Sequence, residues 1–270
     1  MLVSDRHRSS LPLPELARRA VEGGVDAVQV REKGLPRAEL GALTLAVRVA
    51  VGGRAALLIN GDVALAAELG CGVHLPEDGA SPAIARRRLG PAALIGRSVH
   101  SVEAAHASAG ADYLLAGHVF ATASKPGTQP LGVDGLRRIV AASALPVLAI
   151  GGIEPANVAA VLAVGACGVA VISAISGAPE PELAAAALRN AIEEGDTLRM
   201  EQTTIRLRVN GKEVALPTGA TISDFLREKG LHERQVAIEL NGTIVPRREF
   251  GATCLNDGDR VEVVHAVGGG

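Results

Sequence analysis

The sequence has few aromatic residues and almost no net charge. Its 270 residues include no tryptophan, one tyrosine and three phenylalanines, and the formal net charge is -2. So small a charge gives no basic field for a nucleic-acid backbone, and so few rings leave little to stack on bases. We therefore expect no nucleic-acid partner. The core must be built from Ala, Val, Leu and Ile, within a hydrophobic fraction of 48%.

Cysteines and long apolar runs are also scarce. Cys71, Cys167 and Cys254 are odd in number and far apart, which argues against a disulfide framework or a metal knuckle and favours a reducing compartment. The start "MLVSDRHRSS" is charged, unlike a signal peptide, and no apolar run approaches the ~20 residues of a membrane span. A cytoplasmic protein with no membrane partner is predicted.

A recurring pattern organises residues 1–195. A helix end, a glycine, two small residues and a β-branched run follow one another four times, at Gly24, Gly70, Gly110 and Gly165. The gaps leave room for further strands, for which "LVSD", "ALLIN", "ALIGRS" and "PVLAIGG" are the candidates. Eight apolar strands that alternate with Ala-rich helices predict an α/β fold, a parallel (β/α)8 TIM barrel over residues 1–195.

The pattern changes after residue 195. A polar stretch over 196–203 is predicted to be a linker, and the alternation that follows ends at Asn210-Gly211, a hairpin signal that Asn241-Gly242 repeats. Between them Thr221, with an acidic residue three positions on, begins a short helix. The order strand, strand, helix, strand, strand predicts a small α+β domain of the β-grasp (ubiquitin-like) type over 204–270.

This second segment resembles the sulfur-carrier protein of thiamine biosynthesis (ThiS). The matching pieces are "VNGKEV", "VAIELNGTIVPR" and "LNDGDRVEVVHAVGGG". The resemblance implies that a ThiF-like enzyme adenylates the carboxylate of Gly270. The adenylate then becomes a thiocarboxylate that supplies sulfur to a ThiG-like thiazole synthase. A tail that ends in Gly269 and Gly270 suits this role, because it can enter a narrow active site where any Cβ would clash.

Residues 1–195 resemble the thiamine phosphate synthase superfamily, through "VQVREK", "LLIN", "IGRSVHS", "GADYLLAGHVFATASKPG", "VLAIGGI" and "VAVISAI". One subfamily, the synthase, couples a pyrimidine diphosphate to thiazole phosphate with Mg²⁺ held by carboxylates. The other, TenI-like, aromatises a thiazole phosphate carboxylate without metal or cofactor. Gly61 stands where the synthase has Asp, and "HLPED" is a residue short and lacks a Gln. Asp62 and Asp78 remain possible substitutes, although a shifted ligand faces the other way and Mg²⁺ tolerates displacement poorly.

These departures predict a thiazole tautomerase, an isomerase without a metal site. The resemblance makes His118, after the sixth strand, the catalytic base, since imidazole can remove and return a proton near neutrality; His74 and His100 are weaker candidates. Arg31 and Lys33 share a strand face, and Gly151-Gly152 with Ile172-Ser173 form a phosphate cradle. The remaining predicted ligand residues are Gln29, Asn60, Ser98, Thr122, Ser124 and Lys125.

The leading hypothesis is therefore a tautomerase fused to the sulfur carrier, with a thiazole phosphate as its small-molecule substrate. Two alternatives stay open: a thiamine phosphate synthase fused to the carrier, and an inactive barrel that only docks the carrier. The sequence leaves the oligomeric state open, a homo-oligomer included.

Overall fold

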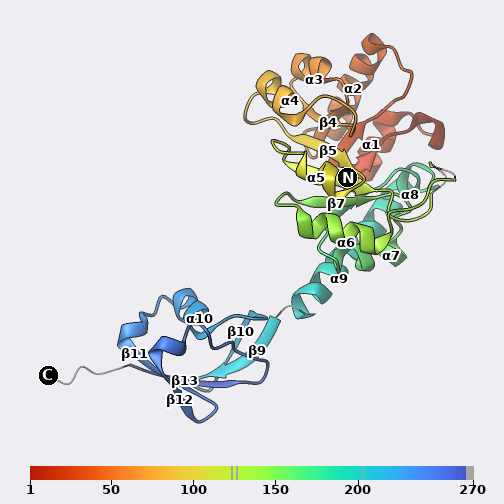
Figure 1. Ribbon diagram of the computed structural model, residues 1–270. Helices are drawn as coiled ribbons and strands as arrows, with labels where there is room; N and C mark the ends of the chain where they lie inside the picture. Colours follow the sequence, from red (N-terminus) through yellow and green to blue (C-terminus); the bar gives the residue numbers. More distant parts are fainter. Residues whose placement is uncertain (123, 126, 203, 266–270) are drawn as a thin grey trace. The chain divides into compact units, whose positions relative to one another are not determined.

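The chain divides into two units, Met1–Asp196 and Thr197–Gly270. The computed structural model describes residues 1–265 except 123, 126 and 203 (Figure 1). The predicted tail residues Gly269 and Gly270 lie outside the described residues. Each unit is built on its own sheet and its own core.

The sheet of the first unit is parallel and follows the order of the chain. Its strands are β1 (Leu2–Val3), β2 (Ala27–Val30), β3 (Ala56–Asn60), β4 (Gly72–Leu75), β5 (Ile95–Val99), β6 (Tyr113–Gly117), β7 (Val147–Ile150) and β8 (Gly168–Ala170). The Val3 amide donates to the Val171 carbonyl at 2.9 Å. Because the first strand thus meets the end of the last, the sheet closes into the predicted barrel.

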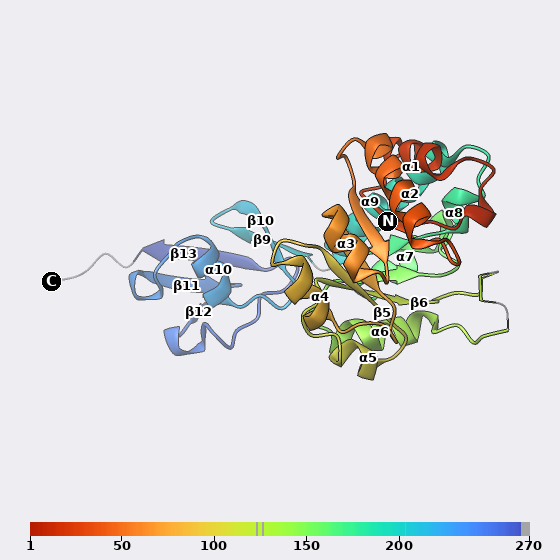
Figure 2. The ribbon, with the colours of Figure 1, turned by 90° about the horizontal axis from the view of Figure 1, so that it is seen from above.

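Helices alternate with these strands, as Figure 2 shows from above. They are α1 (Leu13–Glu22), α2 (Arg37–Val51), α3 (Val63–Leu69), α4 (Pro82–Leu89), α5 (Val102–His106), α6 (Gly132–Ala142), α7 (Pro155–Leu162), α8 (Ser173–Ser176) and α9 (Pro181–Gln202), with a short 3-10 turn at Arg6–Arg8. Local chemistry sets several ends. Asp62 and Ser101 cap α3 and α5 through their side chains, and Gly52 and Gly70 end α2 and α3 in the left-handed region.

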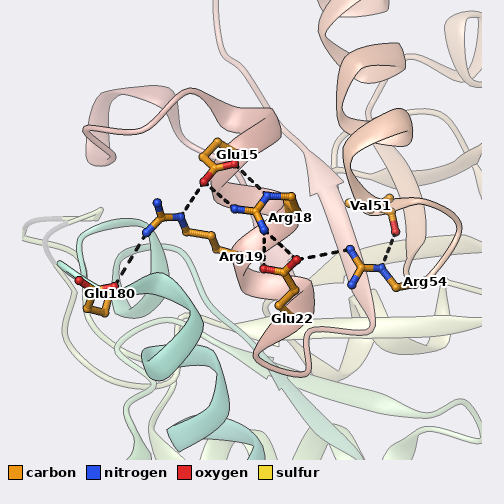
Figure 3. A network of polar contacts seen from close by, with 7 residues as sticks. All are labelled: Glu15, Arg18, Arg19, Glu22, Val51, Arg54 and Glu180. Carbon is orange, nitrogen blue, oxygen red and sulfur yellow. Dashed lines mark hydrogen bonds and ion pairs between the residues drawn. The ribbon is translucent and has the colours of Figure 1, made fainter.

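Ion pairs hold the outer surface of α1 (Figure 3). Glu15 accepts hydrogen bonds from Arg18 and from Arg19, each at 2.7 Å, and these bonds lower the pKa of its carboxyl to about 2. Arg19 also approaches Glu180, just before α9, at 3.9 Å. None of the residues in this network lines the cavity described below.

The barrel core is built almost without aromatic rings, as the composition requires. Fully buried side chains include Leu2, Leu16, Leu58, Ile59 and Leu114. Strands buried on both faces leave little room for polar side chains, because a buried polar group costs free energy unless it is hydrogen-bonded. The buried polar side chains of the barrel lie mainly toward the carboxyl ends of the strands, as Ser4, Glu32 and His118 do.

The second unit has a mixed sheet in the order β10-β9-β13-β11-β12. Its elements are β9 (Thr204–Val209), β10 (Lys212–Pro217), α10 (Ile222–Glu228), β11 (Val236–Leu240), β12 (Thr243–Val245) and β13 (Arg260–His265), with 3-10 turns at Glu233–Gln235 and Arg247–Glu249. The central pair, β9 and β13, is parallel, and the outer pairs are antiparallel. Phe225 and Phe250 fill the core between sheet and helix.

Turn chemistry accounts for this second topology. Asn210-Gly211 and Asn241-Gly242 both have positive φ at both positions, as the tightest hairpins require. The Thr221 hydroxyl caps α10, and the Asp224 carboxylate accepts from the Thr221 amide at 3.0 Å. The predicted β-grasp fold is confirmed, as is the predicted barrel. The stretch predicted as a linker is helical through Gln202, because α9 continues to that residue.

None of the helices in the described part of the chain is both long enough and apolar enough to cross a membrane.

Candidate active site

A cavity of about 1140 Å³ opens at the carboxyl ends of the barrel strands. Residues at the end of every barrel strand, or directly after it, contribute to its lining. All the ligand and catalytic residues predicted within the barrel line it: Gln29, Arg31, Lys33, Asn60, Ser98, His118, Thr122, Ser124, Lys125, Gly151, Gly152, Ile172 and Ser173. Residues up to 144 positions apart thus meet in one place, as the fold requires of strand ends that share an edge.

The β2 side of the cavity carries two cations and one buried amide. Gln29 is 1% exposed, and its Nε2 has no hydrogen-bond partner among the described residues. Arg31 is held by its backbone, whose amide donates to the Ser4 hydroxyl at 2.9 Å. That hydroxyl in turn donates to buried Glu32 at 2.5 Å. The contacts fix the β2 end against the β1 end, and they place the Arg31 and Lys33 side chains at the cavity.

His118 lies directly after β6 and is 8% exposed. Its Nε2 is 3.3 Å from the Thr128 hydroxyl and 3.4 Å from the Thr128 carbonyl oxygen. The backbone after β7 passes so close that a Cβ at Gly151 would lie 2.3 Å from the His118 Cβ. Gly151 is therefore required for this contact, and it has a φ of 97° that also favours glycine.

The residues that follow β7 and β8 form another part of the cavity wall. Gly152 also has a positive φ, and a Cβ there would lie 2.5 Å from the Ala121 carbonyl oxygen. Arg8, after β1, donates to the Ser173 hydroxyl at 3.3 Å. Bare backbone, a hydroxyl and a guanidinium thus lie together where the sequence predicts a phosphate cradle.

A chain of three charged or polar groups crosses the rim. The His100 Nδ1 is 2.5 Å from a Glu77 carboxylate oxygen, and its Nε2 is 3.1 Å from the Lys125 ammonium. The carboxylate accepts from Nδ1, so Nε2 is the lone-pair side that receives the lysine. This contact holds Lys125, one of the predicted ligand residues, at the cavity.

Three polar side chains form a second chain deeper in the barrel. His74, 1% exposed, has its Nδ1 3.1 Å from the Tyr113 hydroxyl and its Nε2 2.8 Å from the Ser98 hydroxyl. Burial, with the charge of Arg31, lowers the pKa of His74 to about 4. His74, a weaker candidate at the sequence level, is thus a neutral interior group and does not line the cavity.

Sequence reasoning missed several residues that line the cavity. Arg8 follows the first strand, and Glu77 follows the fourth. Both stand two to five positions beyond a strand end. That position was the available signal, because every loop at this edge of a barrel faces the same space. Two further charged residues of the cavity that it missed are Asp5 and Glu154.

The carboxylates near the cavity do not fit a magnesium site. Asp62 caps α3, with one oxygen 2.8 Å from the Leu65 amide and the other 3.2 Å from Arg37. Glu77 is occupied by His100. Asp5, Asp78 and Glu154 also line the cavity, but no group of three His, Cys, Asp or Glu residues in the described part of the chain could hold a metal ion. Mg²⁺ requires several oxygens in near-octahedral geometry, and these carboxylates do not form such a set in the described part of the chain.

These features define a class of protein: a (β/α)8 barrel with a cation-lined cavity at its catalytic edge, joined to a ubiquitin-like unit. Residues 1–175 match the thiamine monophosphate synthase family, and residues 186–270 match the ThiS family. The chain belongs to the thiamine monophosphate synthase family.

Individual proteins similar to this chain carry names of the same family. The thiamine-phosphate synthase of Moorella thermoacetica is 42% identical over 187 residues, which cover 67% of this chain and 89% of that protein. The bifunctional protein ThiM/ThiE of Symbiobacterium thermophilum is 44% identical over 184 residues, 66% of this chain and 38% of that longer protein. Thiamine phosphate pyrophosphorylase from Pyrococcus furiosus superposes with a TM-score of 0.65 at 35% identity, covering 72% of this chain and 95% of that one.

The prediction of a tautomerase, an isomerase, is wrong. The similar proteins are thiamine-phosphate synthases, which are transferases. The prediction gave most weight to Gly61 and to "HLPED", two short stretches at strand ends. Loops at strand ends vary while the barrel stays the same, and the similarity extends over the barrel as a whole.

Proposed function

We propose that the barrel is a thiamine-phosphate synthase and that the second unit is its covalently attached sulfur carrier. In the barrel reaction, the C–O bond between a pyrimidine-bearing carbon and diphosphate breaks, and the electron pair leaves with pyrophosphate. A C–N bond forms between that carbon and the nitrogen of thiazole phosphate. The observation that supports this most strongly is the cavity in which cations from three strand ends meet, in a chain whose relatives are synthases.

The cations act on the leaving group. Pyrophosphate gains negative charge as the C–O bond breaks, so fixed positive groups stabilise the transition state more than the bound substrate. Arg31, Lys33 and Lys125 line the cavity from the β2 and β6 ends. Lys125 is positioned by His100, which is held by Glu77. No metal step is included, because the carboxylates do not fit one.

The phosphate of the thiazole partner belongs at the β7 and β8 ends. Gly151 and Gly152 expose backbone there, and Arg8 lies beside Ser173. A dianionic phosphate suits bare amides, a hydroxyl and a guanidinium together. His118 contacts Thr128, whose hydroxyl donates to the Lys125 carbonyl oxygen, and it has no proton to transfer in this reaction, so its proposed role is to orient the loop that carries Lys125.

The second unit carries sulfur. We infer that the Gly270 carboxylate is activated as an acyl adenylate by a ThiF-like enzyme and that a thiocarboxylate then serves a ThiG-like thiazole synthase. The two units would thus act on successive parts of one product, and the covalent link raises the local concentration of one near the other.

The test is to incubate the full chain with the pyrimidine diphosphate and thiazole phosphate and to separate the products by chromatography. We expect thiamine phosphate and pyrophosphate in equal amounts. The Lys33→Ala variant should be slower, and Ser143→Ala, which changes a hydroxyl at the end of α6 that is bonded to its own loop, should match the parent. Absence of product at saturating substrates, with and without Mg²⁺, would rule out the synthase.

A further inference from the structure

Three side chains that the proposed reaction does not use form a line inside the barrel: Tyr113, His74 and Ser98. The Tyr113 hydroxyl lies 3.1 Å from His74 Nδ1, and the Ser98 hydroxyl lies 2.8 Å from His74 Nε2. Tyr113 and His74 are 7% and 1% exposed, whereas Ser98 reaches the cavity. The line therefore runs from the barrel interior to the cavity wall.

The sheet register builds this line. His74 of β4 is level with Gly96 of β5, which is level with Tyr113 of β6. A Cβ at Gly96 would lie 2.1 Å from the Tyr113 ring and 2.6 Å from His74 Nδ1. Only glycine leaves room for the two side chains to meet across the middle strand. Ser98 lies two residues further along that strand, on the same face.

The number of donors and acceptors on each group determines which group donates to which along this line. A neutral imidazole has one donor nitrogen and one acceptor nitrogen. Burial raises the pKa of Tyr113 and lowers that of His74, so the phenol keeps its proton and the imidazole stays neutral. In the part of the chain that the structure describes, His74 Nδ1 is the one hydrogen-bond partner of the Tyr113 hydroxyl, so the phenol proton is satisfied there if Nδ1 accepts it. The phenol therefore donates to Nδ1, the proton of His74 is on Nε2, and Nε2 donates to Ser98.

We propose that Tyr113 and His74 are positioning residues that leave the Ser98 hydroxyl hydrogen free to donate into the cavity, where it binds an oxygen of the diphosphate. Because the Ser98 oxygen already accepts from Nε2, its own hydrogen points elsewhere. Gln29 supports an acceptor at this depth, since it also lines the cavity and its buried Nε2 lacks a partner among the described residues. The identity of the ligand rests on the proposed function, whereas the donor and acceptor roles of Tyr113, His74 and Ser98 do not.

The first test is the tautomer of His74 in the full chain, measured by long-range ¹⁵N–¹H NMR at neutral pH. The protein holds seven histidines, and a His74→Gln variant identifies the His74 signals. We expect the Nε2–H tautomer. In Tyr113→Phe, which removes one oxygen and keeps the ring, the preference should weaken. An Nδ1–H tautomer in the parent protein would overturn the proposal.

The second test is calorimetric binding of inorganic pyrophosphate to the parent, Tyr113→Phe, Ser98→Ala and the double variant. Loss of one neutral hydrogen bond should weaken binding about 3- to 10-fold in each single variant. If Tyr113 acts through Ser98, the double variant should bind no more weakly than Ser98→Ala. Additive losses would overturn the relay and leave Tyr113 a structural role only. Ser143→Ala is the matched hydroxyl control and should bind as the parent does.

The proposed synthase activity and the proposed roles of Tyr113 and His74 can be disproved separately. If the parent protein binds pyrophosphate but makes no thiamine phosphate, the proposed synthase fails, and the relay is still judged by the tautomer and the double variant. If the parent protein binds no pyrophosphate at all, the ligand half of this proposal is overturned together with the synthase, whatever the tautomer.

Discussion

The two units of this chain differ in where their function lies. In the barrel it is spread over side chains from every strand end, which meet in one cavity. In the β-grasp unit the fold supports a chain end, and the proposed chemistry belongs to one carboxylate beyond β13. A function spread over many groups should weaken by steps when single groups are removed. A function concentrated in one atom group should be lost at once.

The largest expected effect is at the tail. Incubation with an adenylating enzyme, ATP and a sulfur donor should add about 16 Da to the chain, as one oxygen is exchanged for sulfur. Deletion of Gly270, or Gly269→Phe, should abolish this shift in intact-mass spectrometry and leave barrel turnover unchanged, because the units are separate domains. An unchanged mass of the parent protein, where a known carrier is converted, would remove the carrier function.

The next effect concerns the stability of the barrel below neutral pH. Because the pKa of His74 is lowered to about 4 from 6.5, the unfolded chain binds more protons between these values. The free energy of unfolding should therefore fall as the pH falls from about 6.5 to 4, by on the order of 3 kcal/mol. Denaturant titrations followed by tyrosine fluorescence report on the barrel alone, since Tyr113 is the sole tyrosine and tryptophan is absent.

Two variants sharpen this pH measurement. His74→Gln keeps a donor and an acceptor without titrating, so the slope over this range should flatten. Ser143→Ala, which removes no titratable group, should keep the slope. A slope that survives in His74→Gln would assign the pH dependence to another group.

A smaller, stepwise effect is expected for the cavity cations. Arg31→Ala should lower kcat/KM of the synthase roughly 10- to 50-fold, the usual size of one charge-assisted contact. Arg54→Ala is the matched control, because Arg54 lies beyond α2 and contacts Glu22 on the outer surface. Equal activity of both variants would place the diphosphate away from the β2 end.

The smallest effect is expected from metal removal. Asp62 is engaged by the α3 cap and by Arg37, and Glu77 is engaged by His100. The cavity cations then carry the charge of pyrophosphate, so EDTA should change turnover by less than about twofold. A loss of tenfold or more that Mg²⁺ restores would show that Asp62 or Asp78 leaves its present place to bind metal.

The fold could be predicted from the sequence because its signals are local. Apolar runs, the Asn-Gly turns and the Thr221 cap each specify short-range structure, and strand ends of a parallel barrel must share one edge. That edge also made the cavity residues predictable. The Tyr113–His74–Ser98 line could not be predicted, since it depends on register between three strands and on the space left by Gly96.

The reaction class was harder to predict than the site. The prediction of an isomerase rested mainly on Gly61 and a shortened loop, and it is wrong, because the similarity to synthases extends over the barrel as a whole. The charge and the hydrogen-bonding groups of a cavity limit which ligands bind there. They say less about which bond of a bound ligand is broken or formed.

The most direct test of the account is turnover by the full chain, measured as thiamine phosphate and pyrophosphate formed together, before and after its tail has been converted to the thiocarboxylate. The account predicts equal amounts of both products and the same rate for both forms of the tail. It would be contradicted if neither product forms at saturating pyrimidine diphosphate and thiazole phosphate, with and without Mg²⁺.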